Sequence, residues 1–147
     1  MFFPLFINME NMKVLCIGAG NIGLRRINIL KNFNADIFVI TKDNIVIDNV
    51  SLEIREVAEE DITNKYEMVI AATNNSRLNE KIIEKAKKVG VKYYNNISDK
   101  SLCNFYFPAV IENNEITCGL ISKNGESHKT AKEYATVIRN VLWKKEK

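Results

Sequence analysis

The chain has 147 residues, enough for one domain with a substantial hydrophobic core. Hydrophobic residues make up 46% of it and charged residues 27%, which excludes a disordered or fibrous class. The net charge of +3 is too small to indicate a nucleic-acid partner, and it is compatible with an acidic ligand or a charged cofactor.

A membrane protein and a secreted protein are also not expected. No apolar run approaches the roughly 18 residues of a membrane span. The apolar start, MFFPLFI, lacks the basic region and cleavage site of a signal peptide. Cys16, Cys103 and Cys118 lie far apart without metal-site spacing, so we expect reduced thiols, no metal and a cytoplasmic location.

Strands and helices are expected to alternate over the first two thirds of the chain. This order predicts right-handed crossovers, and hence a parallel sheet with helices on both faces. Ser76 is the expected N-cap of the second helix, and Gly90 its C-terminal stop. The predicted strands are residues 13–18, 35–41, 52–57, 68–73 and 91–95, and the predicted helices are 21–33 and 76–90.

The pattern changes after residue 95. Residues 104–111 and 115–122 form two strand-like runs with only ENN between them, which predicts an antiparallel hairpin. Three aromatic residues, 105–107, are expected to alternate along its first strand. A last amphipathic helix is predicted over 127–144.

A complete G-x-G-x-x-G pattern, GAGNIG, joins the first predicted strand to the first helix. Gly18 allows the tight turn, Gly20 lets a pyrophosphate approach the backbone, and Gly23 lets the helix pack against the sheet. Asn21 and Ile22 open the helix, whose N-terminal N–H groups favour phosphate. The pattern predicts a Rossmann-like fold that binds a dinucleotide.

The ribose-binding position is ambiguous. Thr41 ends the second strand, where an acid usually binds the ribose, and Lys42 and Asp43 follow. Asp43 suits a ribose hydroxyl and Lys42 suits the 2′-phosphate of NADP, while a solvated loop accounts equally well for both. Ala72 and Thr73 close the fourth strand, where small residues leave room for a ligand.

Longer segments resemble one known family. FFPLFINMENMKVLCIGAGNIGLRR and VIAATNNSRLNEKIIEKAKKVGVKYYNNISDKSLCNFYFPAVIENNEI are similar to the precorrin-2 dehydrogenase/sirohydrochlorin ferrochelatase family of siroheme synthesis. The aromatic segment LCNFYFPA is the most specific part, because generic dinucleotide-binding domains do not carry it. The resemblance extends from Phe3 to about Arg139.

The resemblance implies NAD-dependent oxidation of the tetrapyrrole precorrin-2 to sirohydrochlorin by a homodimer. Asp99 is the implied acid/base, and a different count along the motif places Ser98 there instead. A turn-capping role is the alternative for Asp99. Ser127 matches a serine that contacts the substrate or caps the last helix, and His128 replaces the usual proline beside it.

The expected division is an NAD-binding domain over 1–103, then a hairpin and the start of a helical region over 104–147. The hairpin is the candidate for dimerisation. Longer family members continue into a helical region of which this chain keeps only the first helix, so dehydrogenase activity without iron chelation is expected. The alternatives are a nucleotide-sensing regulatory module and a ferrochelatase without redox activity.

Overall fold

The computed structural model describes residues 3–125 and 127–143. The chain divides into two compact units, 7–105 and 1–6 with 106–147. The boundary between an NAD-binding domain over 1–103 and a hairpin and helical region over 104–147 stays a prediction. No helix in the described ranges is long and apolar enough to cross a membrane.

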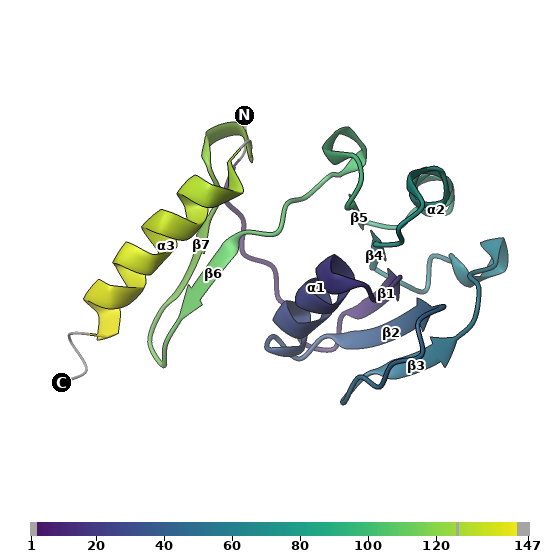
Figure 1. The fold of residues 1–147 in the computed structure, drawn as a ribbon, viewed down its shortest axis with the longest axis horizontal. Helices are drawn as coiled ribbons and strands as arrows, with labels where there is room; N and C mark the ends of the chain where they lie inside the picture. The colour runs from purple at the N-terminus through teal and green to yellow at the C-terminus, as the bar shows by residue number, and fades with distance from the viewer. Residues whose placement is uncertain (1–2, 126, 144–147) are drawn as a thin grey trace. The chain divides into compact units, whose positions relative to one another are not determined.

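The larger unit is the predicted parallel α/β sheet (Figure 1). Its strand order is β3-β2-β1-β4-β5, so the chain reverses direction across the sheet between β1 and β4. Right-handed crossovers in these two directions place the two helices on opposite faces. The elements are β1 (Lys13–Ile17), α1 (Asn21–Lys31), β2 (Asp36–Thr41), β3 (Ser51–Ile54), η1 (Glu59–Asp61), β4 (Met68–Ala71), α2 (Ser76–Lys88), β5 (Tyr93–Asn96) and η2 (Lys100–Leu102).

The core follows from strands that are apolar on both faces. Leu15 in β1 and Val69 in β4 are fully buried and belong to the cluster that Ile82 and Ile83 of α2 cover. On α1, three residues at helical spacing are buried: Gly23, Ile27 and Leu30. Such runs, covered on both sides, are typical of parallel sheets.

The ends of α2 show one correct and one wrong prediction. Gly90 has φ +83°, a conformation that glycine adopts without strain just after a helix. The N-cap is Asn75 and not Ser76, since the Asn75 side-chain oxygen accepts the Leu78 N–H at 3.1 Å. The run NNS offers adjacent residues that can all cap, and propensity alone does not choose between them.

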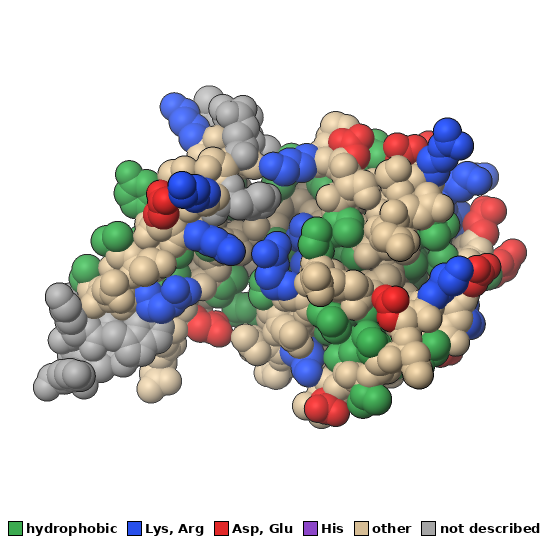
Figure 2. Space-filling view, viewed as in Figure 1, with side chains coloured by type: hydrophobic (Ala, Val, Ile, Leu, Met, Phe, Trp, Pro, Cys, Tyr) green, Lys and Arg blue, Asp and Glu red, His purple; other side chains and the backbone are tan. Residues whose placement is uncertain are grey.

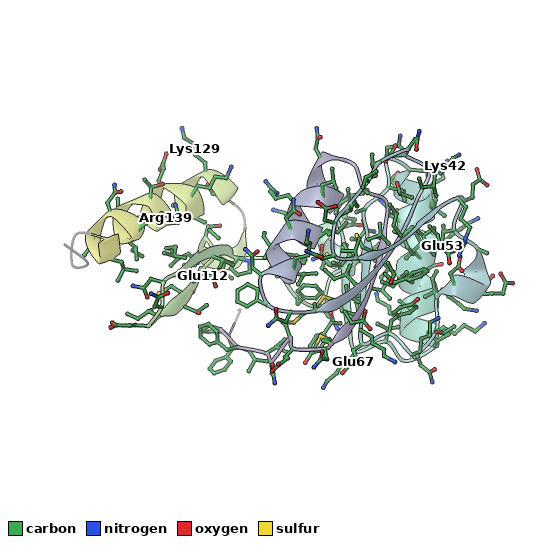
Figure 3. The ribbon with its side chains drawn as sticks, turned by 90° about the horizontal axis from the view of Figure 1, so that it is seen from below. Lys42, Glu53, Glu67, Glu112, Lys129 and Arg139 are labelled. Atoms are coloured by element: carbon green, nitrogen blue, oxygen red, sulfur yellow. The ribbon has the colours of Figure 1, made fainter. Side chains whose placement is uncertain are left out.

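The smaller unit contains the predicted hairpin and last helix. β6 (Ala109–Glu112) pairs antiparallel with β7 (Thr117–Leu120), and α3 (His128–Trp143) packs against both strands (Figure 1). Ile111 and Ala135 are buried here. Arg139 of α3 donates to the Val110 carbonyl at 3.4 Å (Figure 3).

The first hairpin strand is shorter than predicted, so the prediction of three aromatic residues alternating on a strand is wrong. Residues 104–108 lie outside β6. Pro108 has no N–H to offer a strand partner. Asn104 instead hydrogen-bonds β5, where its Oδ1 accepts the Tyr94 N–H at 2.8 Å and its N–H donates to the Tyr94 carbonyl at 3.2 Å.

Candidate functional site

A cavity of about 830 Å³ lies in the larger unit at the carboxyl ends of the parallel strands. It is located where the strand order reverses between β1 and β4, the usual ligand position in open α/β sheets. The structure brings nine of the ten residues predicted for the cofactor to its wall: Gly18, Gly20, Asn21, Ile22, Thr41, Lys42, Asp43, Ala72 and Thr73.

The three glycines of the loop differ in whether a side chain would fit at their positions. Gly18 has φ +93°, and a Cβ there would lie 2.5 Å from the Ala72 carbonyl oxygen. Gly23 is buried, and a Cβ there would collide with the Gly18 carbonyl oxygen, which explains why Gly23 packs the helix instead of lining the cavity. Gly20 has no atom within 4 Å of its Cβ position, so open space meets the backbone at this point.

The N-terminus of α1 has the chemistry of a phosphate site. Gly20 is its N-cap and supplies no side-chain hydrogen bond, and the first turn contains no acidic residue. Its first N–H groups are therefore left for another acceptor, with the positive end of the helix dipole behind them. The open space at Gly20 and these donors together fit the pyrophosphate of a dinucleotide.

At the ribose end, Thr41 and Asp43 form a local turn. Thr41 is 3% exposed, and its hydroxyl donates to Asp43 Oδ2 at 3.1 Å while accepting the Asp43 N–H at 3.2 Å. Thr41 therefore orients Asp43, whose carboxylate is exposed and retains free lone pairs. Asp43 has the right chemistry to accept hydrogen bonds from a ribose diol.

The two cations at this end are held by acidic side chains. Lys42 Nζ lies 2.8 Å from Glu56 Oε1, and hydrogen bonding raises the pKa of Lys42 and lowers that of Glu56. Arg55 makes a two-pronged contact with Asp61, both distances being 2.7 Å, and its Nε lies 2.6 Å from Glu53 Oε2. Figure 3 labels Lys42 and Glu53 on this part of the larger unit.

A buried asparagine that was not singled out from the sequence joins two loops beside the cavity. Asn79 of α2 is 0% exposed and hydrogen-bonds Thr73 after β4 and Ser98 after β5. Its detectable signal is a polar residue that shares the buried helix face with Ile82, Ile83 and Ala86.

The loop after β5 carries Ser98 and Asp99. Asn96 Oδ1 accepts both of their N–H groups, at 2.8 and 3.3 Å. Asp99 Oδ1 in turn accepts the hydroxyl and the N–H of Ser101, at 2.7 and 2.8 Å, and these bonds lower the pKa of Asp99. Asp99 thus caps η2 and is ionised at neutral pH.

The two residues predicted near the start of the last helix lie in the smaller unit. Ser127 Oγ accepts the Thr130 N–H at 3.2 Å, so Ser127 caps α3. The side chain of His128 lies outside the part of the chain that the structure describes.

The cysteines and acidic residues that the structure describes form no recognisable metal site. Within 3–125 and 127–143, no group of three His, Cys, Asp or Glu residues is arranged to hold a metal ion. All three cysteines are free thiols. Burial raises the pKa of Cys16 to about 12, so this thiol stays protonated and unreactive.

The fold and the cavity define a dinucleotide-binding protein of the doubly wound α/β class. A family model described as putative NAD(P)-binding matches residues 5–109. The precorrin-2 dehydrogenase of Bacillus subtilis strain 168 is 32% identical, covering 95% of this chain and 88% of that protein. The chain belongs to the precorrin-2 dehydrogenase family, which confirms the resemblance seen in the sequence and its NAD cofactor.

Other relatives are longer proteins. The probable multifunctional siroheme biosynthesis protein HemA of Ruminiclostridium josui is 36% identical over 95% of this chain, and the siroheme synthase of Blochmanniella pennsylvanica is 32% identical over 82%. The chain spans 28% and 26% of their lengths, respectively. In fold, it matches a structure of SirC, precorrin-2 dehydrogenase, with a TM-score of 0.76 and 22% identity over 95% of this chain and 70% of that one.

Proposed function

We propose that this protein oxidises precorrin-2 to sirohydrochlorin with NAD as the hydride acceptor. The observation that carries the proposal is the cavity at the reversal of strand order, where the open backbone of Gly20 meets the uncapped N-terminus of α1. The similarity to a precorrin-2 dehydrogenase, over 88% of that protein's length, supports the substrate.

The residues at the cavity divide the binding of NAD between them. Gly20 and the first N–H groups of α1 bind the pyrophosphate, and Asp43 accepts the ribose hydroxyls. Ala72 and Thr73 flank the nicotinamide end, where bound NAD supplies the electrophilic ring that takes the hydride. Gly18 and Gly23 shape the loop, Gly18 through its positive φ and Gly23 through its close approach to the Gly18 carbonyl.

The reaction removes two hydrogens from the substrate, a hydride to NAD and a proton to a base. We assign the proton acceptor to Asp99, because a carboxylate that is ionised at neutral pH can accept a proton. Ser98 stands beside it as a hydroxyl that can hydrogen-bond the ligand. Ser127 and His128 are proposed to contact the carboxylate-rich substrate, with Ser127 also capping α3.

The proposal extends to assembly and location. We infer that two copies associate through the hairpin region, residues 104–122, which exposes apolar side chains such as Ile116 and Ile121. Light scattering that gives only monomer mass at micromolar concentration would contradict this dimer. A cytoplasmic location agrees with three free thiols.

The test follows the absorbance of purified protein with precorrin-2 and NAD. Sirohydrochlorin and NADH should form together in equal amounts. Asp99→Asn should reduce kcat about 100-fold or more while NAD binding persists, because an amide cannot take the proton. Normal turnover by this variant would refute the assignment of Asp99.

The same experiment separates the alternatives. Iron-dependent siroheme formation from sirohydrochlorin without NADH would indicate a chelatase. NAD binding without any change in the tetrapyrrole spectrum would indicate a nucleotide-sensing module.

A further inference from the structure

The Asn79 carboxamide makes four hydrogen bonds although it is fully buried. Its Oδ1 accepts the Thr73 N–H at 3.1 Å and the Thr73 hydroxyl at 2.7 Å. Its Nδ2 donates to the Thr73 carbonyl at 3.0 Å and to Ser98 Oγ at 2.8 Å. One side chain of α2 therefore ties the loop after β4 to the loop after β5.

The backbone of Thr73 fixes which way this amide faces. The Thr73 N–H can only donate and its carbonyl can only accept, so Oδ1 must face the former and Nδ2 the latter. Nδ2 is also the atom that meets Ser98 Oγ. Ser98 must therefore accept from Asn79, and its own hydroxyl proton is directed elsewhere.

The Ser98 hydroxyl is placed to donate a hydrogen bond to a ligand. It is exposed, and it directly follows Ile97, which lines the cavity. Its N–H is already bonded to Asn96 Oδ1 at 2.8 Å, which fixes the backbone of the loop. The proton on Ser98 Oγ is thus the hydrogen-bond donor that this side chain has left to offer a ligand.

We propose that Asn79 is a positioning residue that orients the Ser98 hydroxyl, so that Ser98 donates a hydrogen bond to the ligand during turnover and keeps its proton. This inference rests on the proposed dehydrogenase function and adds a residue to it. The contrast with Asp99 supports it, because Asp99 Oδ1 is engaged by Ser101 whereas the proton of Ser98 is kept free by Asn79.

The sharpest test is Asn79→Asp, which is nearly isosteric. The ionised carboxylate has no proton to donate, so the Ser98 hydroxyl should turn and donate to it. We expect kcat to fall about tenfold at pH 8, the effect of one misdirected hydrogen bond. Because burial raises the pKa of a carboxyl group, activity should partly recover at lower pH, where the protonated acid has one O–H that it shares between Ser98 Oγ and the Thr73 carbonyl.

Matched variants test whether Asn79 affects kcat through the Ser98 hydroxyl. Ser98→Ala should lose about tenfold in kcat without the new pH dependence, and Ser98→Thr should retain activity because it keeps the hydroxyl. The double variant Asn79→Asp with Ser98→Ala should be no slower than Ser98→Ala alone, since both changes remove the same donor. Asn28→Asp, on the exposed side of α1, makes the same chemical change outside the site.

NAD titration accompanies every kinetic measurement. Additive losses in the double variant, or equal losses at all pH values in Asn79→Asp, would overturn the inference. Where Asn79→Asp does not fold, Ser98→Ala decides the question, and normal turnover by it would overturn the inference while leaving the dehydrogenase intact. A wild-type protein that does not bind NAD would overturn the proposed function and this inference with it.

Discussion

The two ends of the cavity are lined by different groups, backbone at one end and side chains at the other. At the phosphate end the wall is backbone: Gly18 takes a positive φ, Gly20 leaves open space, and α1 presents N–H groups. At the ribose end the wall is made of side chains, among them Asp43 and the exposed pair Lys42–Glu56. We therefore expect the backbone-lined end to bind any dinucleotide and the end lined by side chains to determine which dinucleotide is preferred.

The same contrast appears in the distribution of charge. On the face shown in Figure 2, acidic and basic side chains are interspersed over the larger unit and form no single positive field. We therefore expect phosphate binding to depend on local geometry at the glycine loop, and the choice of dinucleotide to depend on a few paired charges. Substitutions at the two ends should differ in size and in kind.

The largest effect is expected for Gly18→Ala. The methyl group would meet the Ala72 carbonyl and require a positive φ, so we expect about 2–4 kcal/mol of lost stability. Urea unfolding measures the loss. Unchanged stability would mean that the loop relaxes freely, and that the phosphate end is not fixed.

Gly20→Val should separate binding from folding. Gly20 has ordinary extended angles and nothing within 4 Å, so its replacement should leave the unfolding midpoint unchanged. The new side chain would fill the space assigned to pyrophosphate, and NAD affinity should fall about 100-fold, or 2.7 kcal/mol, an order-of-magnitude expectation. Calorimetric titration that finds wild-type affinity would contradict the placement of the cofactor.

Glu56→Gln should change the choice of dinucleotide. The wild-type protein should prefer NAD, because Glu56 engages Lys42 and adds negative charge beside the ribose position. The variant frees Lys42 for a 2′-phosphate. Because the pair is exposed and therefore weak, NADP affinity should rise only about three- to tenfold, with NAD affinity unchanged.

Two controls sharpen this prediction. Glu60→Gln removes the same charge from an exposed position in η1 and should change neither affinity. Adding Lys42→Met to Glu56→Gln should abolish the gain. A wild-type preference for NADP, or a gain that persists without Lys42, would assign the choice to another residue.

The smallest effect concerns the support of the ribose end. Asp61 receives two hydrogen bonds from Arg55 and one from the Ala58 N–H, and these lower its pKa. Asp61→Asn should therefore cost about 1 kcal/mol at pH 7. The Asp61 carboxyl has a lower pKa in the folded protein than in the unfolded chain, where it is near 4, so its ionised form stabilises the fold at pH values above about 4. This stabilisation is lost as the pH falls through the pKa of the folded protein.

Urea unfolding at pH 7 and pH 3 checks the sign. The difference between wild type and Asp61→Asn should shrink at the lower pH, whereas Asp48→Asn, an exposed change in the loop before β3, should show no such trend. A difference that grows on acidification would contradict the role of the Arg55–Asp61 pair.

The sequence predicts the position and shape of the glycine loop well, because glycine spacing next to a buried strand encodes the backbone there. The sequence does not determine the role of Lys42 at the ribose end, because its partner is Glu56, fourteen positions further on. Their meeting depends on β2 and β3 pairing in a register that places Thr41 opposite Ile54. Periodicity predicts that both strands exist, but it does not give their register.

The loop after β5 illustrates a second limit. The family motif places either Asp99 or Ser98 at the reacting position. Which of the two side chains is available to a ligand depends on hydrogen bonds that only the folded structure shows. Ser101 engages Asp99 from two residues away, a local contact typical of aspartate in turns. Asn79 reaches Ser98 from nineteen residues away, and only the packing of α2 on the sheet brings it there.

The central claim is that this chain binds NAD at the junction of β1 and α1. Calorimetric titration of the purified protein with NAD and, separately, with NADH tests it most directly. Saturable binding of one dinucleotide per chain is expected. No detectable heat or saturation with either nucleotide at millimolar concentration would contradict it.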